Sequence, residues 1–118
     1  MSIYHDHILD HYHHPRHRGR LPHASHHAET RNLSCGDSLQ MDTVITDGVI
    51  QSIGWEGSGC AISQASASIL SDHFVGKTVT EAQRFTATDL LTLLNLDLTP
   101  ARLKCALLSL ETLHQALK

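Results

Sequence analysis

Apolar and polar residues alternate along two neighbouring stretches of the chain, residues 39–45 and 49–55. Side chains of a β-strand point alternately to its two faces, so this period of two predicts two strands with one buried face. Asp47-Gly48 lies between the two stretches, and this dipeptide is typical of a two-residue type I′ turn. The pattern therefore predicts a β-hairpin.

A helical spacing of apolar residues marks both ends of the chain. Residues 2–13 predict a short amphipathic helix that stops before Pro15, because proline disfavours helical backbone in the residue before it. A connector that contains proline, arginine and glycine follows, to about Thr30. Thr99 and Pro100 provide an N-cap and a first-turn proline for a final helix, whose apolar stripe comprises Leu103, Ala106, Leu107, Leu110, Leu113 and Leu117.

Further helices are expected between the hairpin and this final helix. Residues 60–75 are predicted to form one such helix, which ends at the glycine that follows. Thr78 and Glu81 stand three positions apart, as in a capping box, and predict a short helix over 79–85. Residues 88–94 predict another. Strands that precede most of the helices are typical of an α+β fold, in which helices cover one face of an antiparallel sheet.

The length of 118 residues predicts one domain over residues 1–118. No apolar run approaches the roughly 20 residues that span a bilayer. The N-terminal Met-Ser-Ile-Tyr-His-Asp lacks the pattern of a secretory signal. We therefore expect a cytoplasmic protein with no membrane partner. The net charge of −3 gives no electrostatic reason to expect nucleic acid.

Three cysteines and one aspartate supply the candidate chemistry. An odd number of thiols without a secretory signal argues against a disulfide framework. Cys60 and Cys105 fall in the opening turns of predicted helices, where unpaired N–H groups stabilise anions. Cys35 precedes a glycine suited to a turn, and Asp37 is close enough to bind the same ion. Three thiolates and one carboxylate suit zinc or an iron–sulfur cluster.

The helical pattern also places the helix-borne thiols away from the predicted core faces. Cys105 lies about 130° or more from the centre of the leucine stripe. It shares its side of the helix with Arg102, Ser109 and Thr112. Cys60 falls opposite the predicted apolar side of its own helix. Both positions favour ligands over buried cysteines that act as small core residues.

Nine of the eleven histidines fall between His5 and His27. This His-rich N-terminal segment, about residues 5–27, becomes strongly cationic below about pH 6. One interpretation is a second metal-binding tract. The simpler interpretation, solvated helix and loop residues, is favoured because the spacing repeats no ligand pattern.

Four segments resemble the signatures of the IscU/NifU-type iron–sulfur assembly proteins. The matches occur in the same order as in that family and run from about Tyr4 to Leu117. The segments are Asp-His-Tyr-His-His-Pro-Arg-His-Arg-Gly at 10–19, Cys-Gly-Asp at 35–37, Gly-Ser-Gly-Cys-Ala-Ile-Ser-Gln-Ala-Ser-Ala-Ser at 57–68, and Pro-Ala-Arg-Leu-Lys-Cys-Ala-Leu-Leu-Ser at 100–109. The last two look most like the SufU branch. The resemblance implies a SufE/NifU-like α+β fold, with a small antiparallel sheet of about three strands and helices packed on one face.

The same resemblance implies that Cys35, Asp37, Cys60 and Cys105 converge at one exposed end and bind Zn²⁺ or, alternatively, a [2Fe-2S] cluster. It implies a pyridoxal-phosphate-dependent cysteine desulfurase of SufS/IscS type as partner. A downstream iron–sulfur carrier or scaffold would receive the product. Lys104 stands where IscU-type proteins usually carry a histidine, as it does in SufU-type proteins, which bind zinc and relay persulfide sulfur.

Together with the resemblance, these observations predict an iron–sulfur cluster assembly protein of SufU/IscU type that accepts persulfide sulfur from a cysteine desulfurase at a zinc- or cluster-binding site. Cys35 is the expected sulfur acceptor, with Cys105 as the alternative, and Arg102 would support the thiolate or pair with Asp37. A [2Fe-2S] scaffold without sulfurtransferase activity is one rival, because the insertion that SufU proteins usually carry between Cys60 and Cys105 is missing. A structural zinc module is another, which the lack of Cys-x2-Cys knuckles disfavours.

Overall fold

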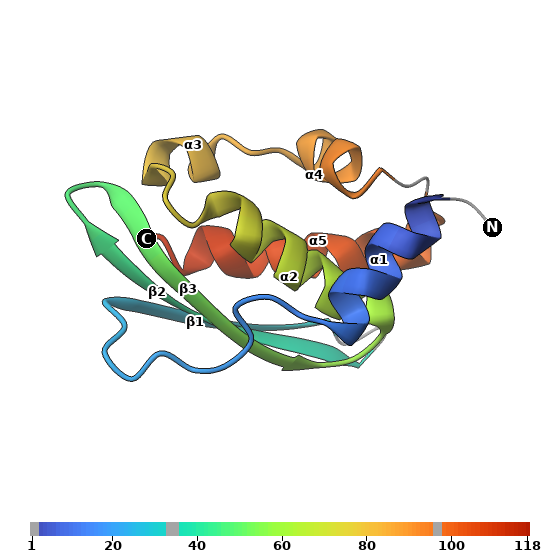
Figure 1. Cartoon of the computed structure of the whole chain (residues 1–118), viewed down its shortest axis with the longest axis horizontal. Helices are drawn as coiled ribbons and strands as arrows, with labels where there is room; N and C mark the ends of the chain where they lie inside the picture. Colours follow the sequence, from blue (N-terminus) through green and yellow to red (C-terminus); the bar gives the residue numbers. More distant parts are fainter. Residues whose placement is uncertain (1–2, 33–35, 96–97) are drawn as a thin grey trace.

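The computed structural model describes residues 3–32, 36–95 and 98–118. Helices cover one face of a three-stranded antiparallel sheet of order β1-β2-β3, as Figure 1 shows. This arrangement confirms the predicted α+β fold. The described elements are α1 (Ile3–His13), β1 (His26–Asn32), β2 (Asp37–Thr46), β3 (Val49–Ser58), α2 (Ala61–Phe74), α3 (Val79–Gln83), α4 (Ala87–Leu94) and α5 (Pro100–Gln115).

The helices form two levels above the sheet. α2 and α5 pack against each other and against the strands, whereas α3 and α4 lie on their far side (Figure 1). α1 packs along α2. The core therefore lies between the sheet and the α2–α5 pair, and fully buried Trp55 is among its largest side chains. No described helix has the length and apolar character needed to cross a membrane.

The predicted hairpin and most helix boundaries are confirmed. β2 and β3 pair antiparallel around Asp47 and Gly48, whose φ angles of 53° and 76° are those of a type I′ turn. At α5, the Thr99 side chain accepts a hydrogen bond from the Arg102 N–H, and Pro100 occupies the first turn. These boundaries could be predicted because each is determined by local turn or cap chemistry.

β1 corrects the sequence prediction, which placed a connector through about Thr30. The strand begins at His26 and pairs along its length with β2. Only Ala28 and Thr30 of its seven residues are buried, so the segment carries almost no apolar signal. Pairing with the longer β2, rather than intrinsic β propensity, makes this segment a strand.

α5 is buried more widely than its leucine stripe predicted. Cys105, Ser109 and Thr112 are all buried, so the expectation that they share an uncovered side is wrong. The helix contacts β1 and β2 as well as α2. Together these three elements cover a broad part of its surface. The two hydroxyls tolerate burial because each donates to a backbone carbonyl of its own helix, 2.7 Å away.

The outer face of the sheet carries a polar network around Asp42, whose side chain is 2% exposed. Burial alone would raise the pKa of this carboxyl. Hydrogen bonds from Arg20 (2.7 Å), the Leu21 N–H (3.0 Å) and His27 (2.6 Å) outweigh burial and lower its pKa to about 2. The hydrogen bonds from Arg20 and Leu21 hold the connector that precedes β1 against the middle of the sheet.

Two histidines of the His-rich segment illustrate its structural contacts. His11 is buried, with its Nδ1 2.7 Å from the hydroxyl of Ser68, and burial lowers the pKa of this imidazole. His17 lies 3.2 Å from Asp72. Within the described ranges, no three metal-ligating side chains of this segment come close enough to share an ion.

Candidate metal centre

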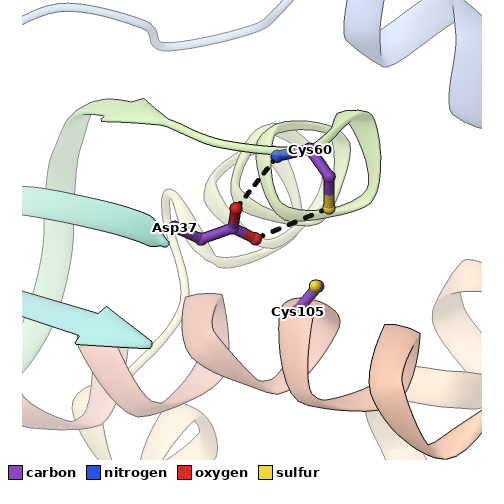
Figure 2. Close-up of side chains that lie close together, drawn as sticks. All are labelled: Asp37, Cys60 and Cys105. Atoms are coloured by element: carbon purple, nitrogen blue, oxygen red, sulfur yellow. Dashed lines mark hydrogen bonds between the residues drawn. The ribbon is translucent and has the colours of Figure 1, made fainter. Parts of the chain in front are cut away.

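Three side chains of ligand type meet at the end of the sheet where β2 begins. Asp37 is the first residue of β2, Cys60 is the N-cap of α2, and Cys105 lies in the second turn of α5. One ligand atom from each lies within 4.8 Å of the others. Figure 2 shows the carboxylate and both sulfur atoms turned toward one another.

Hydrogen bonds from the start of α2 orient the Asp37 carboxylate. The Cys60 N–H donates to Oδ1 at 3.1 Å, and the Cys60 thiol lies 3.5 Å from Oδ2 (Figure 2). The Ser63 hydroxyl also donates to Oδ2. Asp37 is only 3% exposed, so these contacts keep a buried carboxylate satisfied.

Gly59 permits the close approach between the turn before α2 and Asp37. Its φ is +141°, a conformation that side-chain-bearing residues rarely adopt. A Cβ at this position would lie 2.8 Å from the Cβ of Asp37, and closer still to its carboxyl group. The glycine that precedes Cys60 is therefore required for the spacing of the cluster.

Gly59→Ala is expected to lower the free energy of unfolding of the metal-free protein by about 2 kcal/mol or more. Both backbone strain and the overlap with Asp37 contribute to this loss. Urea unfolding followed by circular dichroism measures it. Gly76→Ala is the matched control, because Gly76 also has a positive φ, of +91°, but a Cβ there meets nothing within 4 Å. An equal loss in both variants would show that crowding against Asp37 is unimportant.

Cys105 and Cys60 differ in accessibility. Cys105 is 5% exposed, whereas Cys60 is half-buried at the surface end of the cluster. A pocket of about 270 Å³ opens beside Asp37, lined by Arg31, Asn32, Gly36, Asp37 and Ser38. The cluster thus has a buried side, formed by α5, and a side that a small group could reach from solvent.

Two predicted site residues are not part of the described cluster. Cys35 lies outside the described residues, so its role stays a prediction. Arg102 is exposed in the first turn of α5, and none of the ion pairs within the described ranges includes it. The structure therefore brings together Asp37, Cys60 and Cys105. The supporting role of Arg102, like that of Cys35, stays a prediction.

The donor set fits a zinc-type site. A tetrahedral zinc ion with a Zn–S distance of about 2.3 Å and a Zn–O distance of about 2.0 Å holds these two ligand atoms about 3.5 Å apart. The Cys60 Sγ and Asp37 Oδ2 are 3.5 Å apart. Thiolates are soft ligands and the carboxylate is a hard one, a combination that zinc accepts.

Ser63 also contacts the cluster, although the sequence did not indicate it. It is 1% exposed and lies three residues after Cys60, on the same side of α2. This i, i+3 spacing is the only sequence signal of its position, and it is too common to single out one of several serines. The contacts of its hydroxyl became visible only in the structure.

Taken together, the fold and the cluster define a small α+β domain with a thiolate–carboxylate centre at one end of its sheet. The family model for the NifU-like N-terminal domain matches residues 3–118, and the chain belongs to this family. This finding confirms the resemblance that the sequence motifs indicated.

Individual relatives and solved structures agree with the family assignment. The iron–sulfur cluster assembly scaffold protein IscU of Thermotoga maritima is 36% identical, with 98% of this chain and 93% of that protein covered. The zinc-dependent sulfurtransferase SufU of Bacillus subtilis is 29% identical, over 97% and 88%. The crystal structure of FiSufU, a proposed assembly scaffold protein for the SUF system from Fervidobacterium islandicum, superimposes with a TM-score of 0.85 at 28% identity, covering 100% of this chain and 96% of that one.

Proposed function

We propose that this protein is an iron–sulfur cluster assembly protein of SufU/IscU type, which accepts sulfur from a cysteine desulfurase at a centre formed by Cys35, Asp37, Cys60 and Cys105. The convergence of Asp37, Cys60 and Cys105 is the observation that carries this proposal. Relatives named as an assembly scaffold and as a zinc-dependent sulfurtransferase support it.

The three described residues would have different roles in the centre. Cys105, on the buried side, and Cys60, at the N-terminus of α2, would hold the ion as thiolates. Asp37 would complete the site together with Cys35. Bound zinc supplies positive charge that keeps the thiols deprotonated. Asp37 is the only hard ligand of this set and is therefore expected to be the most exchangeable.

Sulfur transfer needs no change in total oxidation state. The Cys35 thiolate attacks the outer sulfur of a persulfide on the desulfurase, a new S–S bond forms at Cys35, and the old S–S bond breaks. The desulfurase cysteine leaves as a thiolate. The resulting Cys35 persulfide would then pass to a downstream iron–sulfur carrier or scaffold.

The proposal is tested on the wild-type protein. Aerobically purified protein should contain about one zinc per chain and should accept sulfur from a desulfurase of SufS/IscS type. Anaerobic expression followed by an absorption spectrum distinguishes the runner-up, a [2Fe-2S] scaffold without sulfurtransferase activity. A protein that carries a cluster and accepts no sulfur would establish that rival, while zinc that supports only folding would establish the structural zinc module.

Asp37→Cys is expected to tighten zinc binding by about tenfold and to suppress sulfur acceptance, because a thiolate replaces the most exchangeable ligand. Competition with a chromophoric chelator measures affinity, and single-turnover persulfide transfer measures activity. If the variant binds zinc no more tightly and transfers sulfur normally, the Asp37 carboxylate has only a structural role and another group is the fourth ligand.

A further inference from the structure

We propose that Ser63 is a positioning residue of the metal centre, which sets the place of Asp37 as a ligand. This inference rests on the proposed zinc site and adds a residue that does not itself contact the ion. Its evidence is the set of contacts that one buried hydroxyl makes with all three members of the cluster.

The Ser63 hydroxyl lies at the junction of the three elements that carry the centre. It donates to Oδ2 of Asp37, lies 3.6 Å from the Cys60 Sγ, and lies 3.2 Å from the backbone carbonyl of Cys105. The Oδ2 atom that it contacts is also the oxygen that lies 3.5 Å from the Cys60 sulfur. The hydroxyl therefore acts on the carboxylate oxygen that faces the ligand sulfur.

One hydroxyl proton serves two acceptors. The Asp37 carboxylate is the stronger acceptor because it is charged, so the proton points to Oδ2 when Asp37 is in place. The Cys105 carbonyl offers a second acceptor when Asp37 moves away. Ser63 thus positions the carboxylate without leaving a buried hydroxyl unsatisfied when that ligand dissociates.

The other buried serines of α2 have different environments. Ser68 is within 2.8 Å of the His11 ring and the Arg16 N–H, and Ser71 donates to the carbonyl of Ala67. Ser66 is fully buried, and its hydroxyl has no hydrogen-bond partner among the described residues. Ser66 is therefore a matched control, an equally buried hydroxyl one turn further along the same helix.

Ser63→Ala is expected to weaken zinc binding 10- to 100-fold, the usual effect of removing a group that orients a metal ligand. Ser66→Ala should stay within about twofold of the wild type. Competition of the zinc-loaded proteins with a chromophoric chelator gives the affinities, and circular dichroism verifies the folds. Equal zinc affinity of Ser63→Ala and wild type, or equal weakening in both serine variants, would overturn the role of Ser63.

A double-mutant cycle separates positioning through Asp37 from general packing. In an Asp37→Ala background, Ser63→Ala should change zinc affinity by less than about twofold, because the group it orients is absent. The visible spectrum of the Co²⁺-loaded protein should change with Ser63→Ala and not with Ser66→Ala. Additive effects in the cycle, or an unchanged cobalt spectrum, would overturn the inference. Absence of zinc binding by the wild type would instead reject the proposed function, and this role with it.

Discussion

Replacing either Cys60 or Cys105 with Ser is expected to weaken zinc binding by a factor on the order of 100 or more. A structural zinc site distributes about 10–16 kcal/mol of binding free energy over four ligands. A serine hydroxyl does not replace the thiolate, because it stays protonated at neutral pH and binds zinc poorly. Both variants should therefore be purified with much less than one zinc per chain.

Metal analysis and chelator competition measure this loss. Ser109→Ala is the matched control for Cys105, since Ser109 is buried one turn further along α5 and its hydroxyl donates to the Ala106 carbonyl of the same helix. That control should retain its zinc. Full stoichiometric zinc in both cysteine variants would exclude a shared site at Cys60 and Cys105.

Cys35→Ser is expected to abolish stimulation of a cognate cysteine desulfurase, returning alanine release to the rate of the desulfurase alone. A hydroxyl cannot accept sulfane sulfur as a thiolate does, so the desulfurase persulfide would not be discharged. Release of alanine from cysteine in the presence of a reductant measures the effect. The sequence places Cys35 in a turn and not in the core, so circular dichroism should remain that of the wild type.

The outcome with Cys35→Ser also distinguishes the two acceptor candidates. Persulfide on the wild-type protein can be mapped by mass spectrometry after one turnover. Normal stimulation by Cys35→Ser, with persulfide on Cys105, would transfer the acceptor role to Cys105. Because Cys105 is 5% exposed, that result would also require α5 to move during transfer.

Those parts of the fold that depend on local chemistry could be predicted from sequence. Asp47-Gly48 determines the hairpin turn, and Thr99 with Pro100 determines where α5 begins. β1 could not be predicted in the same way, because its polar residues become a strand only by pairing with β2. The burial of Thr112 could not be predicted either. The apolar stripe of α5 marks one buried side, whereas the sheet and α2 together cover a wider part of the helix.

The site was predictable in its ligand types and only partly in its geometry. Asp37, Cys60 and Cys105 were expected together because soft and hard ligands of these types suit one ion, and the structure brings them together. The need for glycine at Gly59 and the contacts of Ser63 could not be read from spacing. Both arise from the approach of β2 to α2, which only the folded chain determines.

The three ligand-type side chains come from a strand, a helix N-terminus and a second helix that are separated in the chain. An ion held by all three is a removable cross-link between the sheet and the α2–α5 layer. Binding to the folded state alone stabilises it by about 4 kcal/mol when free metal is 1,000 times its dissociation constant. Loss of such an ion would lower the free energy needed to open this end of the sheet, where the three elements meet.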